Sequence, residues 1–498
     1  MPQEDWKSLA QSLKIEGRAL IAGKLCDSVS GETFQKENPA TGRPLVPVAS
    51  CQAKDVDHAV RSARDTFESG VWSRLAPAER KKRLVRLAEL MQRHARELAL
   101  LETLDMGKPI SDSISVDIPL SATCIAWNGE AIDKLYDEIA PTDPSVTALI
   151  TREPLGVVAA VVPWNFPLLM ACWKVGPALA AGNSVILKPA EQSPLSAIAL
   201  GKLALEADIP PGVLNIVPGF GETAGQALGL HHDVDALTFT GSTEVGKYFL
   251  RYAAESNMKR VTLECGGKTP HIVMADCEYM DEAVKAAAFG IFYNQGEVCN
   301  AGSRLLLHAS IKDQFLEQLT AFSKTFTPGD PLDPATRMGA IVSHPQMERV
   351  LHYIGVAKSE GASLRLGGTR ERVESGGYFV APTIFDNVDS KMTIAREEVF
   401  GPVLSTLTFN SEEEAIRIAN DTMYGLAAAV WTRSIDVALR TSKRLRAGSV
   451  WVNCFDEGSI SVPFGGFKQS GFGRDKSLHA IKKYTDLKTT WIKIRPHA

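Results

Sequence analysis

Between residues 153 and 266, short apolar runs alternate with longer stretches in which apolar side chains recur every three or four positions. The short runs predict strands at 157–162, 185–187, 213–217, 236–240 and 261–264. The longer stretches predict helices near 168–181, 194–206, 222–231 and 243–255. Alternation of this kind is typical of βαβ units. We therefore expect an α/β fold whose parallel sheet is covered by helices on both faces.

A second alternation covers about 270–450 and predicts a second α/β unit. Helices are expected near 280–293, 311–324, 345–359, 411–421 and 434–445, and strands at 304–308, 427–431 and 449–452. Upstream, one apolar face from Leu84 to Leu101 predicts a helix that Gly107 ends, and a further helix is expected near 113–134. The polar stretch 141–151 is typical of a linker or a surface hairpin, and 484–494 alternates like an edge strand that needs a partner.

Length and charge restrict the class of protein. A chain of 498 residues is too long for one ordinary core and predicts two or three domains. The net charge of −4 provides no basic field for nucleic acid or a membrane surface. Residues 154–173 carry no charge, but Pro163, Asn165 and Pro167 interrupt them. We therefore expect a buried strand, a turn and a helix there, and no membrane span.

Three further features of the sequence bear on cellular location and on metal binding. The eight cysteines are scattered without a CxxC pair, which favours a reducing cytoplasm over a disulfide framework. The ten histidines form no HxxxH or His/Cys cluster, so no metal is expected. Residues 1–6 have neither a basic start nor an apolar core, so no signal peptide is expected.

Polar residues and glycines follow directly after the predicted strands of the first unit. They are Trp164-Asn165, Lys188 with Glu191, Gly219 with Gly221, Thr240-Gly241-Ser242, and Glu264. Because ligands bind at the carboxyl ends of parallel strands, these residues predict a site at one edge of the sheet. The Gly241-Ser242 turn opens a predicted helix, whose free N–H groups suit a pyrophosphate. The usual GxGxxG fingerprint is missing, and such a turn alone is more often only a helix cap.

The segment 293–304 places a thiol, Cys299, in a polar, glycine-flanked stretch between a predicted helix and a predicted strand. Together with the Glu264 carboxylate and the Asn165 amide, it supplies a nucleophile, a base and an oxyanion donor. Each group alone has a plain structural interpretation, and Cys265 is a rival thiol. The combination of the three favours a site for acyl transfer.

Six motifs, in order along the chain, resemble those of the NAD(P)-dependent aldehyde dehydrogenases. They are PWNFP at 163–167, FTGSTxxG at 239–246, LExGGK at 263–268, NQGxxC at 294–299, EEVFGP at 397–402 and PFGGFKxSG at 463–471. The resemblance spans nearly the whole chain and implies the fold of that family. Its parts would be a Rossmann-like NAD-binding domain (1–134 and 154–266), an α/β catalytic domain (267–482) and a small β oligomerisation element (135–153 and 483–498). A homo-oligomer, expected to be a tetramer built as a dimer of dimers, is also implied.

The same resemblance assigns roles to individual residues. Cys299 would attack the aldehyde carbon, and the Asn165 amide with the Cys299 N–H would stabilise the oxyanion. Glu264 would activate the water that hydrolyses the thioester, while Lys174 and Asp475 match proton-relay positions, the second of which is usually Glu. The implied cofactor-binding residues are Val162, Trp164, Lys188, Glu191, Gly221, Thr240, Gly241, Ser242, Val245, Cys265, Gln346, Glu398 and Phe400. Glu191 near a ribose 2′ position favours NAD over NADP.

Positions that match the family's substrate tunnel suggest the kind of aldehyde. They are Asp117, Leu120, Phe166, Leu169, Trp173, Val298, Asn300, Asp456 and Phe464. Two carboxylates beside aromatic walls suit a cationic or polar distal group. Stretches at 104–109, 117–119, 255–260 and 473–480 look most like bacterial polyamine-route enzymes, which oxidise γ-glutamyl-γ-aminobutyraldehyde, 4-aminobutanal or 4-guanidinobutanal.

Other functions stay open at this point. One alternative is a broad-specificity aldehyde dehydrogenase, in which the tunnel carboxylates merely face solvent. A CoA-acylating dehydrogenase would share the thiol, but Glu264 favours hydrolysis to a free acid. A structural protein that had kept only the fold would be expected to lose Cys299, Glu264 or Asn165, and all three are present.

Overall fold

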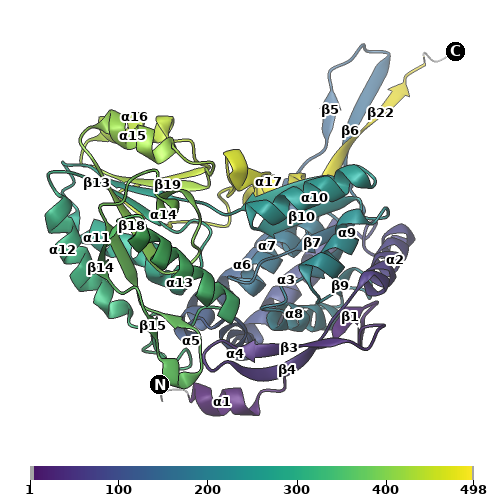
Figure 1. Cartoon of the computed structure of the whole chain (residues 1–498). Coiled ribbons are helices and arrows are strands. Elements are labelled where there is room, and N and C mark those ends of the chain that lie inside the picture. Colours follow the sequence, from purple (N-terminus) through teal and green to yellow (C-terminus); the bar gives the residue numbers. More distant parts are fainter. Residues whose placement is uncertain (1–4, 496–498) are drawn as a thin grey trace.

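The computed structural model describes residues 5–495 and contains two large sheets and a projecting arm (Figure 1). The first sheet has the strand order β2-β1-β9-β8-β7-β10-β11-β21. The strands are β1 (Ala19–Ile21), β2 (Lys24–Cys26), β7 (Val157–Val161), β8 (Ser184–Lys188), β9 (Leu214–Ile216), β10 (Ala236–Gly241), β11 (Arg260–Cys265) and β21 (Gly471–Phe472). From β9 to β11 neighbouring strands are parallel, which confirms the predicted βαβ alternation.

Helices cover both faces of the first sheet. They include α2 (Ala53–Ser69), α7 (Pro167–Ala180), α8 (Leu195–Glu206), α9 (Gln226–Leu230) and α10 (Thr243–Glu255). Along β7, Val158 and Ala160 enter one apolar cluster, whereas Val157, Ala159 and Val161 enter the other. The chain adds strands in one direction from β7 to β9 and in the other from β10 to β11, so a topological switch point lies between β7 and β10. Ligands bind at such points.

The apolar face at 84–101 belongs to two helices, so the expectation of one continuous helix is wrong. The chain leaves the helical path at His94, between α3 (Pro77–Arg93) and α4 (Ala95–Met106). Every residue from Leu98 to Met106 is buried, whereas α3 keeps an exposed face, so the two helices need different surroundings. Gly107 does end α4, in the left-handed conformation with φ +89° that glycine adopts without strain. Next come α5 (Ile110–Asp112), a π-helical turn at Ser113–Asp117 and α6 (Ile118–Ala131).

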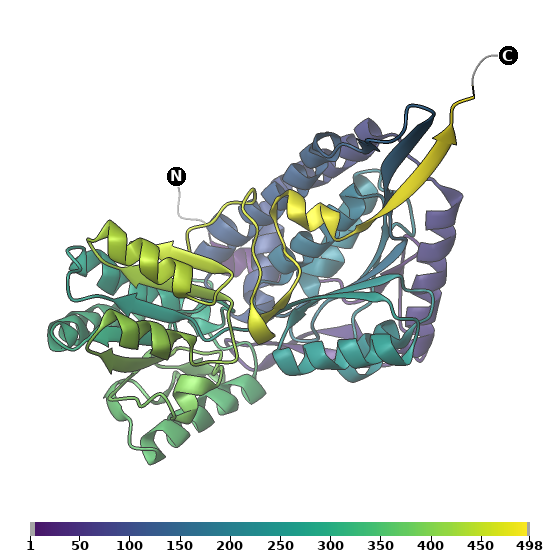
Figure 2. The ribbon, with the colours of Figure 1, turned by 90° about the horizontal axis from the view of Figure 1, so that it is seen from above.

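The second sheet has the order β14-β17-β18-β13-β12-β19-β20 and lies beside the first body, as the view from above shows (Figure 2). Its strands are β12 (Pro270–Val273), β13 (Arg304–His308), β14 (Ser363–Leu366), β17 (Thr383–Asp386), β18 (Val403–Phe409), β19 (Ala427–Trp431) and β20 (Ser449–Val452). The accompanying helices are α11 (Met280–Phe292), α12 (Lys312–Ser323), α13 (His344–Ser359), α15 (Glu412–Asn420) and α16 (Ile435–Arg444). The five predicted helices and strands β13, β19 and β20 are confirmed, whereas β12, β14, β17 and β18 were missed.

A three-stranded arm, of order β22-β6-β5, projects from the first body (Figure 1). It comprises β5 (Glu138–Ala140), β6 (Val146–Pro154) and β22 (Thr485–Lys493). The polar stretch 141–151 is therefore part of a hairpin, and the predicted edge strand pairs antiparallel with β6 along its whole length. Ile139 is 73% exposed and Trp491 is 66% exposed, so the arm presents large apolar side chains to solvent. Its role in assembly stays a prediction, and residues 496–498 lie outside the described part.

The remaining elements are short. They are α1 (Trp6–Ser12), β3 (Thr33–Asn38), β4 (Arg43–Ala49), β15 (Arg370–Glu371), β16 (Phe379–Val380), α14 (Thr393–Arg396) and α17 (Ser477–Lys482). No helix within residues 5–495 combines the length and the apolar character that crossing a bilayer requires. Strand β21 and helix α17 come from the far end of the chain, and β21 extends the first sheet by pairing with β11.

Candidate active site

The thiol of Cys299 lies in the connection between α11 and β13, against the end of β11. Two glycines after β11 permit this close approach. A Cβ atom added to Gly267 would lie 2.7 Å from the backbone oxygen of Cys299, and one added to Gly266 would lie 2.0 Å from Glu398 Oε2. The predicted nucleophile and the predicted base on β11 therefore meet at the carboxyl edge of the first sheet.

The backbone before Cys299 has an unusual shape that hydrogen bonds hold in place. Asn294, Gln295 and Gly296 have φ values of 47°, 58° and 74°, three successive residues in the left-handed region. Gln295 Oε1 accepts the Gly339 N–H at 2.9 Å, and Glu297 Oε1 accepts the Val342 N–H at 3.1 Å. Strain of this kind persists only where the surroundings determine it, and it clusters at active sites. The loop is thus preformed.

Asn165 is joined directly to this loop. Its Nδ2 donates a hydrogen bond to the Glu297 carbonyl at 2.8 Å, and its own carbonyl accepts one from Asn294 Nδ2 at 3.0 Å. An amide nitrogen carries two hydrogens, so the second Asn165 N–H stays free to donate to a reacting oxygen. Asn165 is 4% exposed, and its rigid position suits an oxyanion donor.

The two thiols at this edge of the sheet both have raised pKa values but differ in how far they are exposed. Burial raises the pKa of the Cys299 thiol well above its ordinary value, and the carboxyl groups of Glu264, Glu398 and Asp456 raise it further. Burial also raises the pKa of Cys265, to about 12. Cys265 is 2% exposed, whereas Cys299 is half-buried and can be reached. The Cys299 thiol consequently needs a nearby base to take its proton.

Glu264 has the properties of such a base. Its side chain is 4% exposed, and its Oε1 atom has no hydrogen-bond partner within residues 5–495. The pKa of Glu264 is raised to about 8, chiefly by burial and also by the charge of Asp475, while Lys174 opposes both effects. A carboxyl group that titrates near the working pH is poised for general acid–base catalysis.

Lys174 and Asp475, the two relay candidates, form a buried ion pair behind Glu264. Lys174 Nζ lies 2.5 Å from Asp475 Oδ2, and Lys483 pairs with Oδ1 of the same carboxylate. Although burial raises the pKa of Asp475, the two lysines outweigh it and hold the pKa below its ordinary value. Sequence analysis missed Lys483, the residue directly after α17, because only the fold brings α17 beside α7.

The predicted adenosine and pyrophosphate residues include those at the carboxyl ends of β8 and β10, the two strands on either side of β7. Lys188 Nζ lies 3.2 Å from Glu191 Oε2 just after β8. Ser242 caps α10 by accepting the Val245 N–H at 3.2 Å, which leaves other N–H groups of the first turn free. Thr240 Oγ1 is buried without a partner in the described chain, and open space surrounds the position of a Cβ on Gly221. These features fit a dinucleotide.

The predicted nicotinamide side is built from the segment that follows α14. Glu398 Oε1 accepts the Gly267 N–H at 3.0 Å, and burial raises the pKa of Glu398 to about 7. Phe400 stands edge-on to Trp164, with ring centroids 5.1 Å apart. Gln346 Nε2 donates to the Phe400 carbonyl at 2.7 Å, so Gln346 holds this loop in place. Val162 is 3% exposed and joins β7 to β8 through its N–H bond to the Lys188 carbonyl.

The predicted substrate residues include a cluster of aromatic rings. Trp173 and Phe464 meet edge to face with centroids 5.5 Å apart, and Phe166 contacts Tyr293. Asp456 Oδ1 accepts a hydrogen bond from Asn300 Nδ2 at 2.7 Å, next to the nucleophile in sequence. Among the aliphatic members, Leu169 is buried, Val298 is half-buried and Leu120 is half exposed.

Asp117 does not stand at an exposed tunnel mouth, and this expectation is corrected. Its side chain is 0% exposed, and Oδ2 lies 2.7 Å from Nζ of Lys108, which is also fully buried. The Lys108 ammonium lies 4.1 Å from the centre of the Phe166 ring as well. A buried carboxylate needs a partner, and here the chain itself supplies the cation. Sequence pattern alone did not distinguish this paired carboxylate from a free one.

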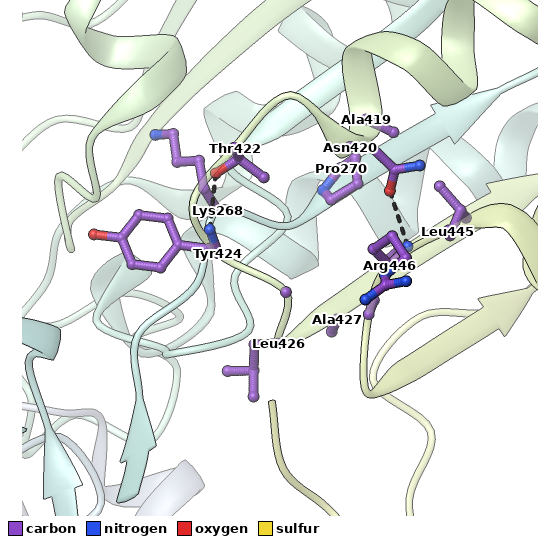
Figure 3. Close-up of a pocket in the computed structure, with 13 residues that line it drawn as sticks. Lys268, Pro270, Ala419, Asn420, Thr422, Tyr424, Leu426, Ala427, Leu445 and Arg446 are labelled. Carbon is purple, nitrogen blue, oxygen red and sulfur yellow. Dashed lines mark hydrogen bonds between the residues drawn. The ribbon is translucent and has the colours of Figure 1, made fainter. Parts of the chain in front are cut away.

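A small pocket at the start of β19 lies outside the predicted site (Figure 3). Its walls include Lys268, Tyr424, Leu426 and Arg446, none of which is a predicted site residue. Two hydrogen bonds fix its rim, from the Arg446 N–H to Asn420 Oδ1 at 2.8 Å and from the Tyr424 N–H to the Thr422 hydroxyl at 3.2 Å. Burial lowers the pKa of Lys268 to about 7. The pocket contributes no group to the thiol site.

Comparison with known proteins identifies the family of the chain. The sequence matches the aldehyde dehydrogenase family over residues 26–490. It is 54% identical to the NADP/NAD-dependent aldehyde dehydrogenase PuuC of Escherichia coli strain K12, over 98% of each chain. The structure of γ-glutamyl-γ-aminobutyraldehyde dehydrogenase from Burkholderia cenocepacia J2315 matches with a TM-score of 0.97 and 57% identity, over 99% of each chain. Indole-3-acetaldehyde dehydrogenase complexed with NAD+ matches with a TM-score of 0.97 and 60% identity, over 98% of this chain and 99% of that one. The chain belongs to the aldehyde dehydrogenase family.

Proposed function

We propose that this aldehyde dehydrogenase uses NAD to oxidise ω-substituted butyraldehydes of polyamine breakdown to carboxylic acids, with Cys299 as the nucleophile. The observation that carries the proposal is the direct connection of its three reacting groups. Asn165 is hydrogen-bonded to the loop that bears Cys299, and this loop lies against the end of the strand that bears Glu264. This arrangement supports addition of the thiol to a carbonyl, followed by hydrolysis of a thioester.

In the first half of the reaction, the Cys299 sulfur adds to the aldehyde carbon. A base takes the thiol proton, and the oxyanion of the thiohemiacetal accepts hydrogen bonds from the Asn165 amide and the Cys299 N–H. NAD supplies the acceptor for the hydride that leaves this carbon. Loss of the hydride converts the thiohemiacetal to a thioester on Cys299.

In the second half, water attacks the thioester, and Glu264 takes a proton from that water. The C–S bond breaks, the carboxylic acid leaves and the Cys299 thiol is restored. The charges of Lys174, Asp475 and Lys483 act on the carboxyl group of Glu264. We propose that this cluster carries the proton onward from Glu264. Hydrolysis to a free acid separates this function from a CoA-acylating dehydrogenase.

A pH dependence follows from the role of Glu264. Its pKa of about 8 means that the basic, ionised form is lost as the pH falls through 8. If deacylation limits turnover, kcat should fall by about tenfold per pH unit below that value and level off above it. The measurement is a kcat profile with a non-titrating aldehyde. A flat profile from about pH 6 to 9 would contradict a rate-limiting role for this base.

The cofactor residues hold NAD along the switch point. Lys188 and Glu191 would bind the adenine ribose, the start of α10 at Gly241 and Ser242 the pyrophosphate, and Glu398 the nicotinamide ribose. Phe400, Trp164 and the backbone at Cys265 would border the nicotinamide ring. The open space beside Gly221 and the unpartnered Thr240 hydroxyl support this assignment.

The choice between NAD and NADP is tested at Glu191. Its carboxylate and a 2′-phosphate would repel each other by about 1–4 kcal/mol at a separation of a few ångströms. The Glu191→Gln variant also leaves Lys188 free to pair with that phosphate. We expect NAD to be preferred in kcat/KM and the variant to narrow the preference mainly by improving NADP.

The control for this prediction is Lys188→Met, which should weaken the binding of both NAD and NADP. The Escherichia coli relative is an NADP/NAD-dependent enzyme, so the ratio of the two kcat/KM values decides the question. If the unaltered protein had equal kcat/KM values for NAD and NADP, Glu191 would not discriminate against NADP and the prediction would be wrong.

The substrate class rests on two kinds of support. A relative from Pseudomonas aeruginosa, 50% identical, is an aminoacetaldehyde dehydrogenase, and the Burkholderia cenocepacia neighbour oxidises a γ-glutamylated aminoaldehyde. In this chain, Asp456 places an exposed carboxylate beside Asn300, the residue that follows Cys299. A broad-specificity aldehyde dehydrogenase is the second candidate, because Asp117 is already paired with Lys108.

Steady-state kinetics on a panel of aldehydes test the proposed function. The formation of NADH would be followed with ω-substituted butyraldehydes and with neutral aldehydes of matched length, each with and without CoA. We expect the substituted butyraldehydes to have the higher kcat/KM, and a free acid as product whether or not CoA is present. Preference for the neutral aldehydes would favour the broad-specificity enzyme, and a CoA requirement would exclude hydrolysis.

We also propose a cytoplasmic homo-oligomer. All eight cysteines are free, which suits a reducing compartment. The arm of β5, β6 and β22 exposes Tyr136, Ile139, Leu487 and Trp491, and exposed apolar groups of this size favour a protein interface. A tetramer built as a dimer of dimers and the three domain boundaries given above belong to the same proposal.

A further inference from the structure

A lysine that the sequence analysis did not single out lies over the aromatic wall of the substrate tunnel. The Lys476 ammonium is 5.4 Å from the centre of the Trp173 ring and 5.7 Å from that of the Phe464 ring. On its other side, a Cβ added to Gly458 would lie 3.4 Å from the same nitrogen. The ammonium is therefore held between the aromatic wall and the loop that follows Asp456.

Lys476 differs from the other lysines around the site in having no anionic partner. Lys108 is paired with Asp117, and Lys174 and Lys483 are paired with Asp475. Within residues 5–495, no hydrogen bond or ion pair engages Lys476 Nζ, which contacts ring faces instead. A cation over aromatic rings keeps its charge available to a further anion, because the rings do not neutralise it.

The opposite charge stands on the neighbouring loop. Asp456 is exposed, and one of its oxygens accepts the hydrogen bond from Asn300. Asp456 and Lys476 both have a backbone φ of +60°, in the left-handed region. Burial lowers the pKa of Lys476, and Asp456 opposes this change. An exposed carboxylate thus lies within electrostatic reach of the ammonium that covers the aromatic wall.

We infer that Lys476 is a specificity-determining residue that selects aldehydes with a carboxylate at their far end. The best distal group has an ammonium beside that carboxylate, as an α-amino acid does, because Lys476 and Asp456 then each bind the opposite charge. The inference deepens the proposed function and rests on it. A purely cationic distal group would meet Lys476 as a like charge, and Asp117 offers it no free carboxylate.

The test removes the charge and keeps the side-chain volume. Lys476→Met and Lys476→Arg would be compared with Lys482→Met, a change of charge on the exposed face of α17. Position 476 has a positive φ, which is equally unfavourable for lysine, methionine and arginine. Lys476→Met and Lys476→Arg therefore add no new backbone strain. The probes are 5-oxopentanoate (anionic), γ-glutamyl-γ-aminobutyraldehyde (zwitterionic), 4-guanidinobutanal (cationic) and pentanal (neutral).

Lys476→Met should lower kcat/KM for the anionic and zwitterionic aldehydes by about threefold to fivefold, mainly through KM, as expected for one partly exposed ion pair. The cationic aldehyde should improve, and pentanal should change by less than about twofold. Lys476→Arg should restore most of the loss, and high salt should shrink the difference between variant and unaltered protein.

Equal effects of Lys476→Met on all four aldehydes would overturn the inference and make the lysine a packing residue only. The same loss in Lys482→Met would assign the effect to overall charge and would also overturn it. If the unaltered protein oxidises substituted butyraldehydes without regard to charge, the inference fails while the proposed function stands. If it prefers pentanal to all of them, the proposed function fails first.

Discussion

The Cys299→Ala variant should lose dehydrogenase turnover almost completely while it still binds NAD. Without the sulfur, neither the thiohemiacetal nor the thioester can form, and the remaining oxyanion donors cannot replace a covalent step. Loss of a nucleophile from a concerted group of residues costs about four to six powers of ten in kcat. NADH formation measures the loss, and calorimetric titration with NAD checks that the cofactor site survives.

The matched control is Cys265→Ala, which removes the rival thiol on the neighbouring strand end. Cys265 is buried, and its pKa is raised to about 12, so this variant should keep most of the activity. The assignment fails if Cys299→Ala turns over at a rate close to that of the unaltered protein, or if Cys265→Ala is the inactive variant.

The Glu264→Gln variant should slow steady-state turnover by about two to four powers of ten, the usual share of general-base catalysis. Glutamine keeps the size of the side chain but cannot accept a proton from the attacking water. Asp475 cannot take over, because Lys174 and Lys483 hold its carboxylate and lower its pKa. Rapid-mixing measurement of NADH separates the first turnover from later ones.

In Glu264→Gln, the NADH of the first turnover should still appear as a burst, provided that acylation depends less on Glu264 than deacylation does. Glu398→Gln serves as a comparison, because Glu398 is a carboxyl near the same thiol for which we propose a role in cofactor binding instead. It should raise the KM for NAD and should not produce a burst. Normal steady-state rates in Glu264→Gln would remove this residue from deacylation.

The five parallel strands of the first sheet, β7 to β11, were predictable because burial on both faces leaves a direct record in the sequence. Every residue from Val157 to Val161 faces one of two apolar cores, so the strand reads as an unbroken apolar run. Strand β12 leaves no such record, because it begins with Pro270 and contains a histidine. His271 is 0% exposed, and its ring stacks between Trp431 and Phe455, a neighbourhood that only the fold creates.

The proposed reacting groups could be named from their sequence motifs. Glu264 and Asn165 lie at or just after the carboxyl ends of parallel strands, which meet at one edge of the sheet, whereas Cys299 reaches that edge on the loop between α11 and β13. Charge pairing was not predictable, because it joins residues far apart in sequence. Lys174 and Asp475 are separated by 301 positions, and Lys476 approaches Trp173 from the same distant segment. Asp117 was misplaced for a related reason, since the burial of a carboxylate and its partner cannot be read from the residue alone.

The most direct test of the central claim is to trap the thioester on Cys299. Glu264→Gln would be mixed with NAD and an aldehyde, quenched in acid after the first turnover and digested, and the peptides would be weighed by mass spectrometry. We predict about one NADH per active site, with the acyl group on the peptide that contains Cys299. NADH without any acyl adduct, or an adduct on Cys265, would contradict the account.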